Sequence, residues 1–429
     1  MSQIWTFPGL KAIPKRTVGV GLTMATAAAL TLAGYELVRS PSNSIFASVY
    51  GKAQLPLVTS LIPVMVVAVA FFYARMLTVL GPRRTLLVST LGTSGLLILA
   101  SLAIRYQVSS VLWFLYLFKE AYIVLLIEQY WSFINSSVGR DDSRRINGVV
   151  CGIASLGSIA AGLVGGQLAE SLGTTNLILV AGIVTIPAAI VADRAFAIFG
   201  EPKDQDRDPG QDGTIIAKDV GLGAFRRERV LVVIMALVVK GQLVGTLLGL
   251  GFQGSLYDAL PDASKQSAYS YIFYAWVNGI AAVFQFLIAP LVLPYLGPRR
   301  VLIAVPCIHL IAISFCLWRP ELTSWAIAFA AFKCIDYSIF RAAKEALYVP
   351  LSFAARYRAK EMIDVVGYRF SKGITSGIIT LIQATGLAIA ESVFASASLV
   401  FVGLWLGISF WLPKEGGIPN TSSPTPTDS

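Results

Sequence analysis

Residues 80–84 read LGPRR, and the same five residues return at 296–300. Each copy lies between two apolar runs, and Gly-Pro followed by basic residues is typical of a tight turn between helices. Other features repeat at nearly the same offset: the pair FK at 118 returns at 332, and VV at 149 returns at 365. The chain is therefore predicted to contain two copies of one unit, arranged in parallel along the sequence.

The apolar runs around these turns are long enough to cross a bilayer. The chain is 55% hydrophobic and 14% charged, its mean hydropathy is +0.70, and a membrane-spanning helix needs about 20 apolar residues. We expect an all-α membrane protein with twelve transmembrane helices in two six-helix pseudo-repeats. The predicted segments are a cytoplasmic N-terminus (1–16), a first six-helix bundle (17–198), a cytoplasmic central loop (199–228), a second six-helix bundle (229–412) and a disordered cytoplasmic tail (413–429).

The positive charge follows the topology of such a protein. The net charge is +10, but lysines and arginines gather in short connections on one side, which predicts that both termini are cytoplasmic. We expect a multi-pass, monomeric protein of the inner membrane that binds the lipid bilayer and no nucleic acid. Four cysteines without metal-ligand or disulfide spacing, one histidine and no nucleophile motif predict no cofactor, no metal and no enzyme activity.

One predicted span holds five ionisable residues. It reads AFKCIDYSIFRAAKEALYVPL over 331–351, and each charge at the centre of a span costs about 2.5 to 3.5 kcal/mol. On a continuous α-helix all five occupy about half of the circumference. Asp336 is spaced to pair with Lys333 and Glu345 with Arg341, which leaves Lys344 as the free cation. This surplus of positive charge predicts an anionic ligand.

Polar residues also mark two other predicted spans. Glu120, Glu128 and Asn135 share one face of the fourth helix, and Asp364, Arg369 and Lys372 lie on or beside one face of the eleventh. Two interpretations remain open: a shared ligand site, or interhelical ion pairs that hold the bundle together. Four arginines at the repeated turns are interpreted as topology determinants and cytoplasmic gate contacts, namely Arg83, Arg84, Arg299 and Arg300.

Two six-helix halves with a Gly-Pro-Arg-Arg turn after the second helix of each are the arrangement expected of a major-facilitator-type transporter, whose substrate site lies between the halves. Two stretches also resemble the bacterial and plastid ATP/ADP antiporters. AKEALYVPL (343–351) is similar to their Thr-Lys-Glu-Met-Ala-Tyr-Ile-Pro-Leu signature. KEMIDVVGYRFSKG (360–373) is similar to their Lys-x-x-x-Asp-Val-Val-Gly-x-Arg-x-x-Lys pattern.

The resemblance implies nucleotide exchange and places site residues on the matching positions, which include Lys344, Glu345, Tyr348, Lys360, Asp364, Arg369 and Lys372. A fainter likeness covers Glu120 and the residues up to Asn135. The chain departs from the family after Arg39, where Ser42 and Asn43 replace a Lys-Asp pair. Glu36 and Arg39 could lie at the interface with the lipid headgroups or reach the cavity.

We therefore expect an alternating-access transporter that exchanges nucleotides of the ATP/ADP type or a related phosphorylated anion. The alternative is a proton-coupled major-facilitator exporter of another organic solute, with Glu120 and Glu128 as the titrating pair. A scaffold of the same fold that has lost transport is a further alternative. The sequence contains no Walker-type loop, so a bound nucleotide would be cargo and not fuel.

Overall fold

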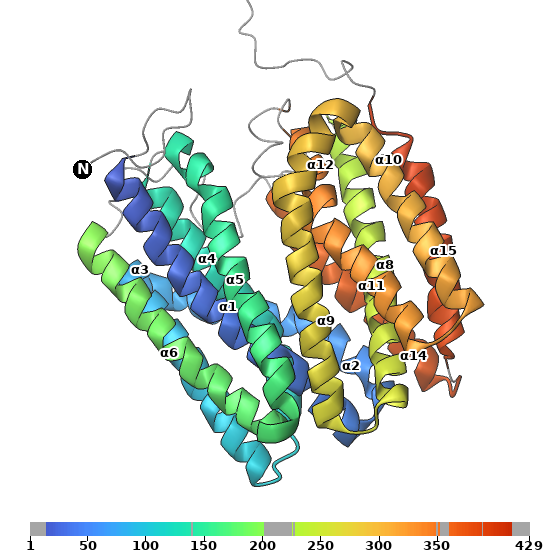
Figure 1. The fold of residues 1–429 in the computed structure, drawn as a ribbon, viewed down its shortest axis with the longest axis horizontal. Helices are drawn as coiled ribbons and strands as arrows, with labels where there is room; N and C mark the ends of the chain where they lie inside the picture. The colour runs from blue at the N-terminus through green and yellow to red at the C-terminus, as the bar shows by residue number, and fades with distance from the viewer. Residues whose placement is uncertain are drawn as a thin grey trace, which may run out of the picture.

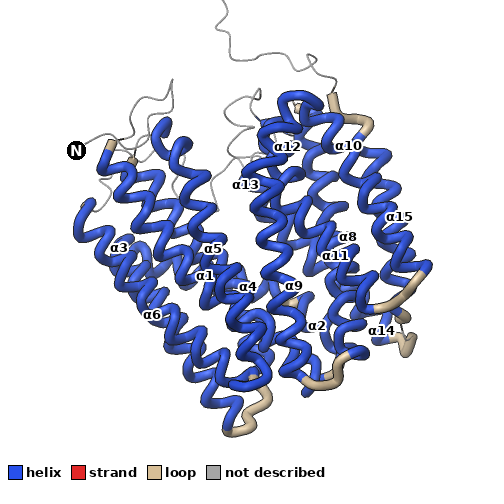
Figure 2. Tube along the Cα trace, viewed as in Figure 1, coloured by secondary structure: helices blue, strands red, loops and turns tan. Residues whose placement is uncertain are grey.

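The computed structural model describes residues 14–138, 140–200, 225, 228–348, 351, 360–387 and 389–413. Every regular element in these ranges is a helix, as Figure 2 shows, which confirms the all-α prediction. Seven of the described helical runs are long and apolar enough to cross a membrane. Nearly all of the predicted central loop and tail lie outside the described residues.

The first half contains the helices that the apolar runs predict, ended mostly by glycines and polar turns. Gly51, Gly173 and Gly200 stand at helix ends with positive φ, which a residue without a Cβ adopts at little cost. The elements are α1 (Lys15–Tyr50), η1 (Lys52–Gln54), α2 (Leu55–Ser60), α3 (Ile62–Arg105), α4 (Val111–Ser137), α5 (Arg140–Leu172) and α6 (Thr174–Phe199).

The second half repeats this plan but contains three π-helical segments, named η3, η4 and η6. Its elements are α8 (Arg229–Ala259), α9 (Ala263–Val283), η3 (Phe284–Ile288), α10 (Ala289–Trp318), α11 (Leu322–Ile335), η4 (Asp336–Phe340), α12 (Arg341–Tyr348), α13 (Lys360–Met362), η6 (Ile363–Phe370), α14 (Ser371–Ala384) and α15 (Glu391–Ser409). A π-helical turn inside an α-helix is rare and often lies at a functional site.

The repeated LGPRR motifs form the same backbone turn. Gly81 in α3 has φ 73° and ψ 171°, and Gly297 in α10 has φ 71° and ψ 158°, whereas the residues around them are helical. A residue with a Cβ avoids this conformation. Each of these two long helices is therefore two spans joined by a tight turn, which agrees with the predicted repeat and is consistent with twelve spans.

The two halves lie side by side, as Figure 1 shows. Contacts between them run from α5 to α9, from α1 to α9 and from α2 to α14. At the end of α1 away from Lys15, the ammonium group of Lys52 forms an ion pair with Asp258 and lies 3.5 Å from Glu391 Oε1. Asp258 ends α8 and Glu391 begins α15, so this contact joins the halves at the face opposite the N-terminus.

The Lys52 contact is charged at neutral pH. Partial burial opposes the positive charge, but the hydrogen bond and charge of Asp258, together with Glu391, outweigh it and raise the pKa of Lys52 above its ordinary value. Lys52 is about as exposed as its partner Asp258, with side-chain exposures of 40% and 52%. The contact therefore fixes the relative position of the halves more than it adds to stability.

Close helix packing inside the first half depends on Gly157 of α5. A Cβ at this position would lie 2.6 Å from the carbonyl carbon of Ala29 and closer still to its oxygen, so the backbones of α5 and α1 touch. We expect Gly157→Ala to lower the free energy of unfolding by about 1 to 3 kcal/mol, because the helices must separate. Thermal unfolding of the purified protein measures the loss.

Gly95→Ala on α3 is the matched control, since a Cβ there meets no atom within 4 Å. Its melting temperature should equal or slightly exceed that of the wild type, because alanine favours a helix more than glycine does. Equal melting temperatures for all three proteins would contradict the proposed contact between α1 and α5.

Candidate functional site

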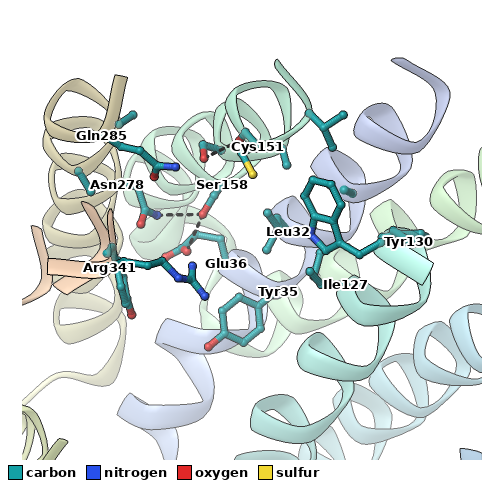
Figure 3. Close-up of a pocket in the computed structure, with 18 of the residues that line it drawn as sticks. Leu32, Tyr35, Glu36, Ile127, Tyr130, Cys151, Ser158, Asn278, Gln285 and Arg341 are labelled. Carbon is teal, nitrogen blue, oxygen red and sulfur yellow. Dashed lines mark hydrogen bonds between the residues drawn. The ribbon is translucent and has the colours of Figure 1, made fainter. Parts of the chain in front are cut away.

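A cavity of about 360 Å³ lies between the two halves (Figure 3). Its first-half wall comes from α1, α4 and α5, and its second-half wall comes from α9, η3, η4 and α12. Ligand sites of transporters built from repeats lie at such interfaces. The polar and aromatic lining residues are Tyr35, Glu36, Arg39, Tyr130, Trp131, Ser155, Ser158, Asn278, Gln285, Tyr337 and Arg341.

The wall formed by α1 follows from the spacing of its residues. Leu32, Tyr35, Glu36 and Arg39 recur at intervals of three and four, which places them on one face of an α-helix. This face carries both charged groups of α1 that reach the cavity. Of the two positions that the sequence left open for Glu36 and Arg39, the structure therefore shows the one at the cavity.

Glu36 and Arg39 belong to a hydrogen-bonded network that crosses from one half to the other. Arg39 donates a hydrogen bond of 2.5 Å to Glu36 Oε1, and Ser158 donates one of 3.1 Å to Glu36 Oε2. Asn278 on α9 donates to Ser158 at 2.9 Å, and Figure 3 shows Ser158 between the other two residues. The network thus connects α1 and α5 of the first half with α9 of the second.

The guanidinium of Arg39 also contacts the second half directly. It lies 3.4 Å from the ring centroid of Tyr274 on α9 and 5.5 Å from that of Tyr35. A cation over an aromatic face is stabilised by the quadrupole of the ring. Arg39 is therefore held by the carboxylate of Glu36 and by two tyrosines, of which Tyr35 also lines the cavity.

Two π-helical turns shape the second-half wall. Gln285 lies in η3 and Tyr337 in η4, and Arg341 directly follows η4 at the start of α12. The expectation of one continuous α-helix over 331–350 is wrong here, because η4 changes the register between Lys333 and Arg341. Arg341 lines the cavity, and within the described residues it makes no ion pair.

Residues 17–343 match the family model of the Major Facilitator Superfamily. The chain belongs to this superfamily. Residues 326–416 also match the family model named TLC ATP/ADP transporter. This facilitator is 36% identical over 87 residues to ADP,ATP carrier protein 1 of Rickettsia conorii, and 34% identical over 87 residues to that of Rickettsia bellii. Each match spans 19% of this chain and only 18% of the relative's length.

Solved structures of facilitators share the fold. A mutant of the nucleoside transporter NupG superimposes with a TM-score of 0.65 at 12% identity, covering 92% of this chain and 98% of the other. A bacterial homologue of the human lysosomal transporter Spinster, in an inward-facing unoccupied conformation, gives 0.64 at 16% identity, covering 96% and 100%. At these identities the likeness shows the fold alone.

Most predicted site residues of the facilitator lie beside the cavity and not on its wall. Lys344 is 3% exposed, and its ammonium lies 3.9 Å from Glu345 Oε1 and 4.9 Å from the ring of Tyr368. Glu345 also accepts a hydrogen bond of 2.5 Å from Lys360. The prediction that Lys344 is the free cation is therefore wrong, and so is the pairing of Glu345 with Arg341.

Lys333 lies in α11 and Asp336 in η4, and neither residue lines the cavity. The ammonium of Lys333 lies 5.0 Å from the ring of Tyr337 and 5.4 Å from that of Phe329, and Asp336 is 8% exposed. Tyr348 is buried, and the centroid of its ring lies 5.8 Å from the ammonium of Lys360. The side chains of Asp364 and Arg369, which the resemblance places at the site, lie outside the described residues.

Glu120 and Lys372 form an ion pair between the halves. Lys372 on α14 lies 3.3 Å from Glu120 Oε2 on α4, and Lys119 lies 3.3 Å from Glu120 Oε1. Of the two interpretations left open for Glu120 and Lys372, this contact agrees with the interhelical ion pair. Glu128 and Asn135 are exposed farther along α4 and are not lining residues of the described cavity.

The arginines of the repeated turns bind within their own halves. Arg83 donates to both carboxylate oxygens of Asp193 on α6, at 2.7 and 3.0 Å, and Arg299 donates to the carbonyl of Phe410 after α15 at 3.4 Å. Arg84 and Arg300 are exposed. Each turn is thereby joined to the last helix of its half. The role of these four residues in topology or at a gate stays a prediction.

Sequence reasoning missed the uncharged polar residues of the cavity. Ser158, Asn278 and Gln285 interrupt apolar runs, but single hydroxyl and amide groups are common in membrane helices and carry little signal. Asn278 and Gln285 are seven residues apart, a spacing that places two residues on one helix face. This spacing was the signal that could have identified them.

Proposed function

We propose that this facilitator exchanges nucleotides of the ATP/ADP type, or a related phosphorylated anion, across a membrane by alternating access. The observation that carries the proposal is the position of Arg341. It lies in the segment that matches the TLC ATP/ADP transporter family, and it lines the cavity between the halves. The two Rickettsia relatives that the chain matches over 87 residues are named ADP,ATP carrier protein 1.

The chemistry of the cavity supports an anion with an aromatic ring. A phosphate group inside a low-dielectric barrier needs compensating positive charge, and an arginine can bind two phosphate oxygens at once. Arg39 and Arg341 supply guanidinium groups on opposite walls. Trp131, Tyr35 and Tyr337 offer flat apolar faces to a base, which stacks on aromatic side chains.

Exchange follows from the cost of moving an empty site. Glu36 neutralises Arg39, but Arg341 makes no ion pair with a described residue. Without an anion, Arg341 therefore carries an uncompensated charge through the barrier, and buried unpaired charges are strongly unfavourable. A loaded site is closer to neutral and crosses more easily. From the distribution of basic residues we further propose that both termini are cytoplasmic. The proposal also places the protein in the inner membrane, as a monomer that is not an enzyme and whose partners are an anionic small molecule and the lipid bilayer.

One observation favours the second candidate, proton-coupled transport. Glu36 is a completely buried carboxylate at the cavity. The predicted titrating pair, Glu120 and Glu128, fits this role less well, because Glu120 lies between two lysines and Glu128 is about 12 Å farther along α4. Glu36 is therefore the better candidate for a coupling residue.

Counterflow in proteoliposomes tests the proposed exchange. We expect labelled ATP to enter vesicles loaded with ADP several times faster than vesicles loaded with glucose, because an exchanger needs a charged return cargo. Protein-free vesicles give the background rate. Equal uptake with both loads would exclude obligate exchange. Uptake at background for ATP, ADP and a panel of phosphorylated metabolites would exclude the proposed cargo class.

A further inference from the structure

The nucleotide exchange proposed above assigns no role to Glu36, although this acid is fully buried beside the cavity. Its carboxylate is 0% exposed, near the middle of α1, and it is also a lining residue of the cavity. Removing a carboxylate from water costs several kcal/mol unless a cation and hydrogen bonds compensate. Arg39 is the cation that compensates Glu36, at 2.5 Å.

The same guanidinium is one of the two arginines that an anionic cargo meets. Arg39 and Glu36 together carry no net charge, so Arg341 alone is left to balance the charge of a phosphorylated cargo, which is about −2 for each terminal phosphate above pH 7. In a site of low dielectric this excess of negative charge is strongly unfavourable. Protonation of Glu36 removes the excess charge.

The other groups around Glu36 do not provide a substitute. Among the described residues, the titratable groups that face Glu36 besides Arg39 are tyrosines. Tyrosine hydroxyls stay neutral below about pH 10. The charged cavity residue of the second half is Arg341, on α12, and α5 contributes the hydroxyl of Ser158. The facing tyrosines are Tyr35 on α1, Tyr122 on α4, and Tyr271 and Tyr274 on α9.

The hydrogen bonds of Glu36 suit both protonation states. Ser158 donates to the carboxylate and accepts from Asn278. A hydroxyl can donate or accept, so it can also receive a hydrogen bond from a protonated Glu36. The hydrogen bonds that start at Glu36 end at Asn278 on α9 of the second half. A change in the protonation state of Glu36 therefore changes hydrogen bonds in both halves.

We propose that Glu36 takes up one proton whenever an anionic cargo binds Arg39, so that the facilitator moves a proton together with each anion. The proton comes from water on the open side and forms an O–H bond on the Glu36 carboxylate. At the same time the hydrogen bond from Arg39 to Glu36 is replaced by one from Arg39 to the cargo. Release of the cargo on the other side reverses both changes and returns the proton to water there.

This inference rests on the anionic cargo of the proposed function, and calorimetry can test it with ADP. The purified full chain is titrated at about pH 8, where the phosphates of free ADP, with a second pKa near 6, are ionised. Titrations in two buffers of different ionisation enthalpy give the number of protons taken up. We expect about one proton per bound ADP, and a dissociation constant that rises about tenfold per pH unit.

Three variants identify the proton acceptor. Glu36→Gln should bind ADP without proton uptake and with a dissociation constant independent of pH, because the amide already mimics the protonated acid. Glu36→Asp keeps a carboxylate and should keep the uptake. Glu321→Gln is the control, since this acid is 57% exposed at the start of α11, far along the chain from α1, and its variant should behave as wild type.

The outcomes separate the two claims. ADP binding by the wild type without proton uptake overturns the coupling and leaves the proposed exchange standing, and this result needs no variant to fold. Proton uptake that persists in Glu36→Gln also overturns the role of Glu36. Absence of binding for ADP, ATP and the panel of phosphorylated metabolites overturns the proposed cargo, and the coupling with it.

Discussion

Arg341→Ala is expected to lower ADP-driven uptake of ATP about ten- to hundredfold, because a hydrogen bond to a charged group contributes about 1.5 to 3 kcal/mol and each 1.4 kcal/mol is a factor of ten. Arg341 is exposed to the cavity and makes no ion pair within the described part of the chain. Its loss therefore removes positive charge without breaking an ion pair, and the buried Asp336 keeps Lys333 and Lys344 as nearby cations. Expression and melting temperature should change little.

Two variants make this result specific. Arg341→Lys keeps the charge but not the two-pronged geometry of a guanidinium, and it should retain part of the uptake. Arg319→Ala removes an arginine that is 62% exposed after α10 and bound to Glu321, and uptake should stay at the wild-type rate. Wild-type uptake in Arg341→Ala at equal reconstitution would remove Arg341 from the site.

The fold could be predicted from the sequence because its signals are local and repeated. The LGPRR copies each contain a glycine that the turn requires, and both glycines adopt the expected positive φ. Long apolar runs predicted the helices of both halves. The π-helical turns left no comparable signal, since η4 reads DYSIF, contains neither glycine nor proline, and shows its extra residue only in the backbone.

The site was predicted less well, and η4 is one reason. The assignment of faces from Lys333 to Glu345 assumed a regular 100° per residue, which a π-helical turn interrupts. Of the five charged residues in this span, Arg341 is the one that lines the cavity. Lys344 was left without a partner because its neighbour Glu345 was assigned to Arg341. The partner of Lys372 could not be found from spacing along one helix, because it is Glu120, 252 positions away.

The second large effect concerns this pair of Glu120 and Lys372, which joins α4 to α14. Glu120 lies 3.3 Å from both Lys119 and Lys372, and Lys119 is 1% exposed. Glu120→Gln therefore leaves a buried lysine without its carboxylate, and breaking a buried pair costs about 3 to 5 kcal/mol. We expect the melting temperature to fall, and the ATP uptake of the remaining folded protein to fall more than tenfold, because the halves lose a charge contact that the cycle must break and remake.

A double-mutant cycle isolates the contact between the halves from the burial of Lys119. Glu120→Gln, Lys372→Gln and the double variant should give a coupling energy of about 0.5 to 3 kcal/mol in stability. Asp193→Asn is the matched control: this acid binds Arg83 within the first half, and its side-chain exposure of 29% is close to the 24% of Glu120. We expect Asp193→Asn to lower stability modestly and to leave the uptake rate per folded molecule unchanged.

The comparison decides whether the charge pair acts in transport or only in stability. One outcome is that Asp193→Asn and Lys372→Gln reduce uptake per folded molecule equally. In that case an ion pair between the halves has no more effect on transport than one within a half, and Glu120 and Lys372 contribute to stability only. If only Lys372→Gln changes it, the pair acts as a contact that each transport cycle opens. A coupling energy of zero would mean that Glu120 stabilises Lys119 alone. The 3.3 Å contact between Glu120 and Lys372 would then contribute nothing to the free energy of unfolding.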